Sequence, residues 1–294
     1  MFALPPEVLA RLRPLRLHTR LGAAAHGHGL HASQQRGSGL EFSQYRSYEQ
    51  GDDLRQVDWK LFARSDRYFV REAERESPLA AWIVLDVTAS MAQTDQARPH
   101  VTRLDVAKQI AACAVQVALQ GGDRFGLIAV NDAQVQPTPS GLGARHRDRC
   151  LLAIDGMSSA GRWPDATRLS PAWNMLGPHS LVLLLSDCFD DDVVEMAEKL
   201  AATGRDVCLL QILMADERDF PFRGGHLFVD TENANTLLGD ADALRADYLQ
   251  RFADARSALQ ARCAHAGIRM ATHFSDAAID APLHALFGAL ARAA

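Results

Sequence analysis

From residue 80 onward, short apolar segments alternate with segments of helical periodicity, and this alternation limits the folds open to the chain. The apolar segments are short, continuous and rich in branched aliphatic residues, which predicts buried strands. They cover residues 80–87, 123–130, 180–185, 206–213 and 269–274. The helical segments cover residues 103–120, 145–155, 169–176, 191–203, 241–266 and 277–294. Strands joined by helices form parallel sheets, so we expect a doubly wound α/β/α sandwich over residues 79–294.

Residues 1–78 have a different character, because they lack long apolar runs and are dense in charge. They are predicted to form a smaller N-terminal module, with a short helix over 54–64 and a strand over 68–72. The first forty residues carry five arginines against one glutamate. This basic stretch is interpreted as a solvated arm, or alternatively as a docking surface for an acidic partner or anionic lipid.

Composition excludes several classes of protein. A net charge of −5 argues against nucleic acid as the main partner, because a phosphate backbone calls for a basic face. The five cysteines are widely spaced and form no metal-binding or redox motif, which is typical of a reducing compartment. Neither a signal peptide nor an uncharged stretch of about 20 apolar residues is found. A soluble, cytoplasmic protein is therefore expected.

Two of the predicted strands end in polar side chains that suit a metal ion. The strand 80–87 runs into Asp86, Thr88 and Ser90, and the strand 180–185 is followed by Asp187. The carboxyl ends of parallel strands meet at one edge of a sheet, so these oxygens can converge. An all-oxygen set predicts a hard divalent cation such as Mg²⁺, Ca²⁺ or Mn²⁺. The alternative is that both aspartates only cap the helices that follow them.

The segment Asp86–Met91 resembles the first loop of the metal-ion-dependent adhesion site of von Willebrand factor A domains. That pattern is Asp-x-Ser-x-Ser, and here Thr88 replaces the first serine while keeping its hydroxyl. The resemblance implies a second loop that supplies a threonine, for which Thr167 is the candidate, and a third loop that supplies Asp187. It also implies a module that grips partner proteins through Mg²⁺ and does not catalyse.

A second resemblance lies upstream and is carried by Gly39–Phe42, Arg46–Trp59 and Ala63–Arg64. These segments are similar to a bacterial family, the domain of unknown function fifty-eight. Asp216–Pro221 and Phe228–Glu232 resemble the same family. The resemblance implies partnership with a MoxR-type AAA+ ATPase and with other von Willebrand factor A proteins. Many relatives begin with transmembrane helices, which are not found in this sequence.

The upstream signature interleaves arginines with aspartates, which suits an internal network of ion pairs or a face for a partner ATPase. Within it, Trp59 and Phe62 are predicted to be core residues. The signature residues with a binding or structural role are Arg46, Asp52, Asp53, Arg55, Asp58, Trp59 and Arg64.

The sequence lacks residues that several classes of enzyme need for catalysis. A haloacid dehalogenase-type phosphatase needs a second aspartate two residues after the nucleophile, where this chain has Thr88. Neither a P-loop, a GxSxG elbow nor a dinucleotide-binding glycine motif in the required place is found. Two main hypotheses remain: a metal-dependent protein-binding module, and a divalent-metal-dependent hydrolase that uses Asp86. The third alternative is a degenerate, empty site in a domain that binds by shape alone.

Overall fold

The computed structural model describes residues 4–20, 41–48, 57–74, 79–133, 135–229 and 236–288. The chain divides into two compact units, one formed by residues 1–27 together with 79–294 and the other by residues 28–78. The larger unit holds the predicted metal-binding residues, and the smaller unit holds the upstream signature.

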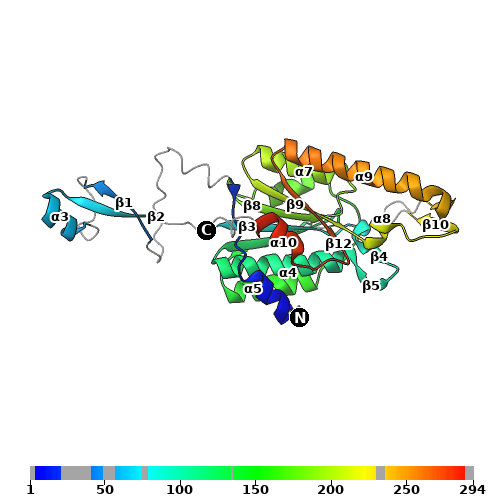
Figure 1. The fold of residues 1–294 in the computed structure, drawn as a ribbon, viewed down its shortest axis with the longest axis horizontal. Helices are drawn as coiled ribbons and strands as arrows, with labels where there is room; N and C mark the ends of the chain where they lie inside the picture. Colours follow the sequence, from blue (N-terminus) through cyan, green and yellow to red (C-terminus); the bar gives the residue numbers. More distant parts are fainter. Residues whose placement is uncertain are drawn as a thin grey trace. The chain divides into compact units, whose positions relative to one another are not determined.

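A six-stranded sheet forms the centre of the larger unit (Figure 1). Its strand order is β12-β9-β8-β3-β6-β7, in which the first five strands are parallel and β7 runs antiparallel at the edge. The strands are β3 (Ala80–Asp86), β6 (Arg124–Val130), β7 (Val135–Gly141), β8 (Leu181–Ser186), β9 (Asp206–Leu213) and β12 (Arg269–Phe274). The predicted doubly wound α/β class is confirmed.

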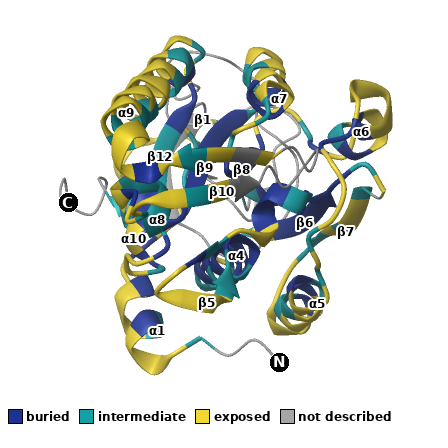
Figure 2. Cartoon of the chain, turned by 90° about the vertical axis from the view of Figure 1, so that its right-hand side faces the viewer, coloured by how far each residue is buried: buried dark blue, intermediate teal, exposed yellow. Residues whose placement is uncertain are grey.

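Helices cover both faces of this sheet, because alternate residues of each buried strand point to opposite sides (Figure 2). Ile83 and Leu85 belong to one apolar core, and Trp82 and Val84 belong to the other. The first core is closed by α1 (Pro6–Leu12), α4 (Arg103–Gly121), α5 (Ala144–Asp155) and α10 (Ala281–Phe287). The second is closed by α6 (Ala166–Trp173), α7 (Asp191–Ala202) and α9 (Ala241–His265).

In the larger unit, two predicted helices differ from the structure by three or more residues at an end. Helix α6 begins at Ala166, three residues before the predicted start, because the Asp165 side chain caps the backbone N–H groups of Thr167 and Arg168. Pro171 consequently lies inside the helix and not in its first turn. Helix α10 spans Ala281–Phe287 and begins four residues after the predicted start at 277, beyond the turn that follows β12. Residues 289–294 of the predicted helix lie outside the described residues.

The first twenty residues belong to the sheet unit, and the interpretation of this stretch as a solvated arm is wrong for the described part. Helix α1 buries Val8 and Leu12 in the core beside α4. Its Arg11 forms a bidentate ion pair with the buried carboxylate of Asp280. The N-terminal module expected over residues 1–78 is therefore shorter and spans residues 28–78, since α1 buries its apolar side against the sheet unit.

The smaller unit contains an antiparallel pair, β1 (Glu41–Ser47) and β2 (Phe69–Glu74), and the helix α3 (Trp59–Ser65). The helix begins later than the predicted 54–64, because Asp58 is its N-cap and accepts hydrogen bonds from the N–H groups of Lys60 and Leu61. Trp59 does not take the predicted core position, since it is 57% exposed, with its ring edge-on to Phe62 and Tyr68.

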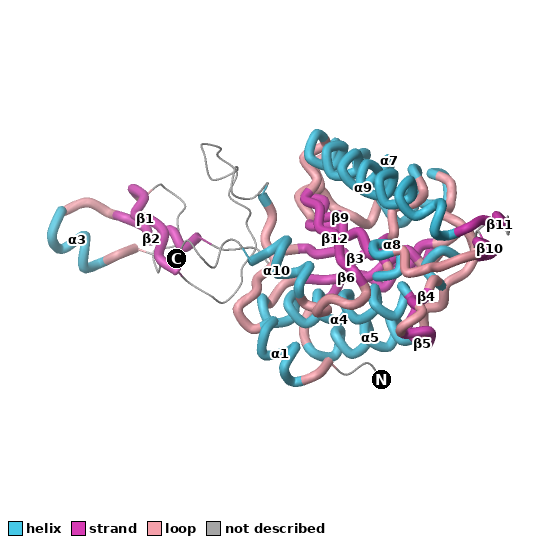
Figure 3. Tube along the Cα trace, turned by 45° about the vertical axis from the view of Figure 1, so that its right-hand side comes forward, coloured by secondary structure: helices cyan, strands magenta, loops and turns pink. Residues whose placement is uncertain are grey.

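Several short elements surround the carboxyl edge of the large sheet, and the sequence did not predict them (Figure 3). They are the 3-10 helix η2 (Ala89–Ala92), the hairpin β4 (Thr94–Asp95) and β5 (Arg98–Thr102), the helix α8 (Ala215–Asp219), and the hairpin β10 (Gly225–Val229) and β11 (Thr236–Asp240). Within the described ranges, no helix combines the length and apolar character that crossing a bilayer requires.

Candidate metal centre

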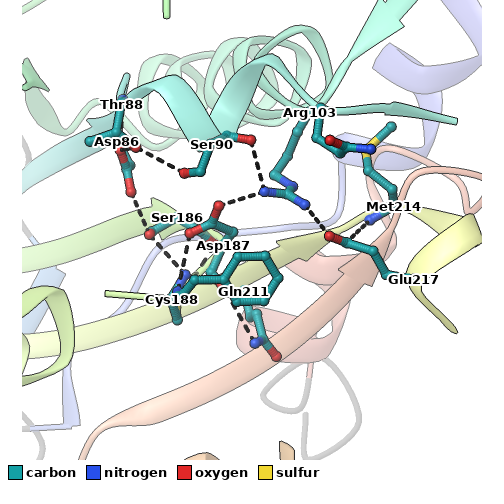
Figure 4. Close-up of polar contacts among 12 residues, drawn as sticks. Asp86, Thr88, Ser90, Arg103, Ser186, Asp187, Cys188, Gln211, Met214 and Glu217 are labelled. Atoms are coloured by element: carbon teal, nitrogen blue, oxygen red, sulfur yellow. Dashed lines mark hydrogen bonds and ion pairs between the residues drawn. The ribbon is translucent and has the colours of Figure 1, made fainter. Parts of the chain in front are cut away.

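The candidate site lies where β3 and β8 end side by side. The two strands pair in parallel with Leu85 opposite Leu185, so the next residues, Asp86 and Ser186, leave the sheet at the same edge. The side chains of Asp86, Thr88, Ser90, Ser186 and Asp187 are buried, with Asp86 and Asp187 each only 2% exposed. The polar side chains that end these strands therefore meet in one small region of low solvent access, shown in Figure 4.

The first loop gathers three side-chain oxygens around Asp86. The Thr88 hydroxyl donates to Asp86 Oδ1 over 2.7 Å and stands 3.0 Å from the Ser90 hydroxyl. The Thr88 N–H also donates to Asp86 Oδ1, over 2.9 Å. On the other side, the Ser186 hydroxyl donates to Asp86 Oδ2 over 2.6 Å. The structure thus brings the predicted ligands Asp86, Thr88 and Ser90 together.

Asp187 lies in the same region and forms an ion pair with Arg103. Nη1 of Arg103 contacts Asp187 Oδ2 at 2.5 Å and also donates to the backbone oxygen of Ser90 over 3.0 Å. The other carboxylate oxygen of Asp187 accepts the N–H of Phe189, and the Phe189 ring lies 5.1 Å from the guanidinium carbon. A positive side chain therefore connects Asp187 to the loop that holds Asp86.

Glu217 completes the polar cluster from α8. Its Oε1 pairs with Nη2 of Arg103, and its Oε2 accepts the N–H of Met214 over 2.7 Å. The backbone oxygen of Glu217 accepts the hydroxyl proton of Tyr248 on α9. Three carboxylates and one guanidinium thus occupy neighbouring positions at the edge of the sheet (Figure 4).

The electrostatics of this cluster favour an added positive charge. Burial, and after it the nearby negative charge of Asp187, raise the pKa of Asp86 to about 7, against the hydrogen bonds from Ser186 and Thr88. Burial also raises the pKa of Glu217 above its ordinary value, although the Arg103 charge opposes this shift. An ionised Asp86 is therefore costly unless a cation lies close to it.

Asp86 and Asp187 are not the caps of the long helices that follow them, because other residues occupy those cap positions. Thr102 caps α4 through a capping box with Asp105, and Asp190 caps α7. Asp86 and Asp187 instead accept N–H groups within their own turns, from Thr88 and Phe189. Neither carboxylate is needed to begin a long helix.

Thr167, the predicted second-loop ligand, is exposed in the first turn of α6, and none of the hydrogen bonds that join the other predicted ligands includes it. The loop that precedes α6 does lie against the first loop, because the N–H of Ala89 donates to the backbone oxygen of Gly161. The structure therefore places the second loop beside the cluster without placing Thr167 in it.

The donor set at Asp86, Thr88 and Ser90 fits a small hard cation. Neighbouring ligands of an octahedral Mg²⁺ ion, each about 2.1 Å from the metal, stand roughly 3.0 Å apart. The separations of 2.7 and 3.0 Å between the three side-chain oxygens match that spacing. Among the residues that the structure describes, no group of three or more His, Cys, Asp or Glu side chains is arranged to hold a metal ion, so a bound ion needs the hydroxyls.

Arg103 and Glu217 were not predicted as members of the site. Arg103 begins a helix and resembles any other arginine in the sequence, so only its burial, 1% exposed, reveals it. Glu217 falls in the segment Asp216–Pro221 that carries the resemblance to the bacterial family, and that was the one available signal. Asp52, Asp53 and Arg55 lie outside the described residues.

Of the other signature residues, Arg46 lies in β1 but its side chain is outside the described part. Asp58 is buried as the cap of α3, and Arg64 is exposed in the last turn of that helix. The network of ion pairs expected from the signature stays a prediction.

Fold and cluster together define a doubly wound α/β protein with a cradle of buried oxygens at the carboxyl edge of its sheet. Residues 44–258 match the family model described as protein of unknown function DUF58. The match covers well over half of the chain, and this chain belongs to that family.

Curated relatives come from mycobacteria. The chain is 31% identical over 155 residues to the uncharacterized protein Rv1480 of Mycobacterium tuberculosis and to the uncharacterized protein Mb1516 of Mycobacterium bovis. The aligned region is 53% of this chain and 48% of each relative. The chain thus spans about half the length of the curated relatives it matches.

Solved structures with a similar course of the chain have low sequence identity. A conserved hypothetical protein, BatB from Bacteroides thetaiotaomicron, is 15% identical with a TM-score of 0.43, over 73% of this chain and 96% of that one. An aerotolerance-related membrane protein from Bacteroides fragilis is 16% identical with a TM-score of 0.43, over 71% and 98%. The SpRpn10 VWA domain is 12% identical with a TM-score of 0.42, over 70% and 94%.

Proposed function

We propose that this chain is a non-enzymatic protein-binding module that holds a hard divalent cation, Mg²⁺ in the first place, at the carboxyl edge of its sheet. The observation that carries the proposal is the convergence of Asp86, Thr88 and Ser90, with oxygen separations of 2.7 and 3.0 Å. When bound there, the cation supplies the positive charge that attracts a carboxylate of a partner protein.

The arrangement of acids supports binding in preference to hydrolysis. A hydrolase needs a second side chain that is free to donate or accept a proton near the reacting group. Thr88 lies two residues after Asp86, and its hydroxyl donates its hydrogen bond to that carboxylate. The remaining acids of the cluster, Asp187 and Glu217, are both paired with Arg103. This pairing leaves no acid of the cluster besides Asp86 for the role of a general acid or base.

A MoxR-type AAA+ ATPase is the proposed partner. Support comes from membership of the DUF58 family. The upstream segments resemble that same family, and the resemblance implies an association with such ATPases. Another protein of the von Willebrand factor A type is the second kind of partner expected. A surface carboxylate on the partner would match the charge of the cation.

The test is capture of a purified MoxR-type ATPase by the full chain in Mg²⁺ and in EDTA. Asp86→Asn, which keeps the shape of the side chain, should abolish the Mg²⁺-dependent part of capture. Asp254→Asn is the matched control, because it removes one exposed carboxylate from α9, away from the cluster. Equal capture by wild type and Asp86→Asn in both buffers would refute the proposal. Metal-dependent turnover of phosphate esters that Asp86→Asn loses would favour the hydrolase instead.

A further inference from the structure

Arg103 is a buried cation inside the candidate metal centre. It lies at the first position of α4, and its side chain is 1% exposed. A guanidinium is expensive to remove from water, and burial is tolerated only where carboxylates compensate its charge. Its Nε has no hydrogen-bond partner in the described part of the protein, so the carboxylates bear most of this compensation.

Three separate segments hold this guanidinium. Nη1 contacts the Ser90 backbone oxygen after β3 and the Asp187 carboxylate after β8, while Nη2 contacts Glu217 on α8 after β9. The half-exposed ring of Phe189 lies against the guanidinium and shields it from water. One carboxylate that the metal site would use is thus already neutralised by a side chain of the protein.

We propose that Arg103 is a resident cation that competes with the divalent metal for the Asp187 carboxylate and thereby keeps metal affinity low. The inference rests on the metal site of the proposed function. Two cations in one buried cluster repel each other strongly, because the local dielectric constant is far below that of water. A metal that uses Asp187 must also displace Nη1 from Oδ2, where the two atoms now stand 2.5 Å apart.

Glu217 is the second carboxylate partner of Arg103, and it allows the strength of the competition for Asp187 to change. It offers Arg103 a carboxylate outside the oxygen cradle, and its position is fixed by the N–H of Met214 and by the Tyr248 hydroxyl on its backbone oxygen. The neighbouring Asp216 ties the same helix to the β4–β5 hairpin through the N–H of Gln96. Any contact that moves α8 therefore changes how firmly Arg103 is drawn away from Asp187, and with it the affinity for metal.

The test is calorimetric titration of the metal-free full chain with Mg²⁺, with thermal melting as the check on folding. The double variant Arg103→Met with Glu217→Gln removes one charge of each sign and leaves no unpaired partner on α8. It should bind Mg²⁺ about tenfold or more tightly than wild type. Arg103→Lys retains the charge and should stay close to wild type.

A second pair of variants tests the same competition without emptying the buried position. Glu217→Gln leaves Arg103 to Asp187 alone and should weaken Mg²⁺ binding severalfold. Asp219→Asn is its control, since it removes the same charge from the same helix at an exposed side chain that pairs with Arg218. Its affinity should stay near that of wild type.

The two proposals fail in different ways. If the double variant binds Mg²⁺ no more tightly than wild type and Arg103→Lys, the competition is refuted, even where capture of the ATPase depends on Asp86 as proposed. If neither wild type nor the double variant binds Mg²⁺, the competition is refuted as well, because removal of Arg103 should have revealed the site. Tight binding by the double variant alone supports the competition and shows that wild type holds its metal weakly.

Discussion

The cost of ionising Asp86 gives the sharpest quantitative test of the candidate metal centre. The pKa of this carboxyl rises from 3.8 to about 7 because of its burial and the nearby charge of Asp187. A carboxylate whose pKa is higher in the folded state destabilises the fold when it is ionised. A shift of this size corresponds to roughly 4 kcal/mol, since each pKa unit is worth about 1.4 kcal/mol.

The sign of the pH dependence follows from the pKa of Asp86 in the unfolded chain, 3.8, and in the folded chain, about 7. Above about pH 7 both states of the metal-free chain are ionised at Asp86, and the full cost is present. As the pH falls from 7 toward 4, the folded state binds the proton first and the cost disappears. Asp86→Asn never carries the charge, so it should be more stable than wild type by up to about 4 kcal/mol at pH 8 and equally stable near pH 4.

The assay is urea unfolding of wild type and Asp86→Asn in EDTA, at intervals from pH 4 to pH 8.5. Saturating Mg²⁺ at pH 8 should stabilise wild type, because the ion binds only the folded state, and leave Asp86→Asn unchanged. Asp86→Asn that is no more stable than wild type at pH 8 would refute the electrostatic reasoning. A difference between the two proteins that does not change with pH would refute it too.

Three further predictions concern other parts of the larger unit. Burial lowers the pKa of His273 to about 4, so this side chain by itself should lower the free energy of unfolding by about 3 kcal/mol as the pH drops from 6.5 to 4, opposite in sign to the Asp86 contribution. In urea melts, His273→Leu should therefore become more stable relative to wild type by about that amount between pH 6.5 and pH 4. Leu12→Ala should cost about 3 kcal/mol in the same assay, because the side chain is fully buried; an exposed N-terminal arm would lose almost nothing. Gly161→Ala should lower the free energy of unfolding by at least about 1 kcal/mol, because φ is +69° and an added Cβ would run into the Asp132 carboxylate. It should also lower Mg²⁺ affinity in calorimetry. Gly177→Ala, with no atom within 4 Å, should change neither.

Apolar periodicity was enough to predict the five parallel strands of the large sheet and most of its helices. The buried strands read as continuous apolar runs, as strands covered on both faces do, and the predicted bounds of β9 and β12 agree with the structure. The β4–β5 hairpin at the carboxyl edge lacks this signal, because β5 does not bury a continuous apolar face. The start of α6 was missed because its cap at Asp165, and not Pro171, sets the boundary.

The convergence of Asp86, Thr88 and Ser90 was also within reach of the sequence, because alternate residues after a strand face the same way and parallel strands end at one edge. The role of Arg103 could not be predicted from the sequence, since its partners Asp187 and Glu217 are 84 and 114 residues away along the chain. Sequence carries no direct record of which side chains meet across such separations.

By itself, the sequence determined the α/β class and the oxygen-rich end of β3, because both depend on local periodicity and on the direction of neighbouring side chains. Only the tertiary structure decided that α1 belongs to the sheet unit and that a buried arginine shares the site with Asp187 and Glu217. Those outcomes depend on which distant segments exclude water from one another, and burial of that kind is a property of the packed chain.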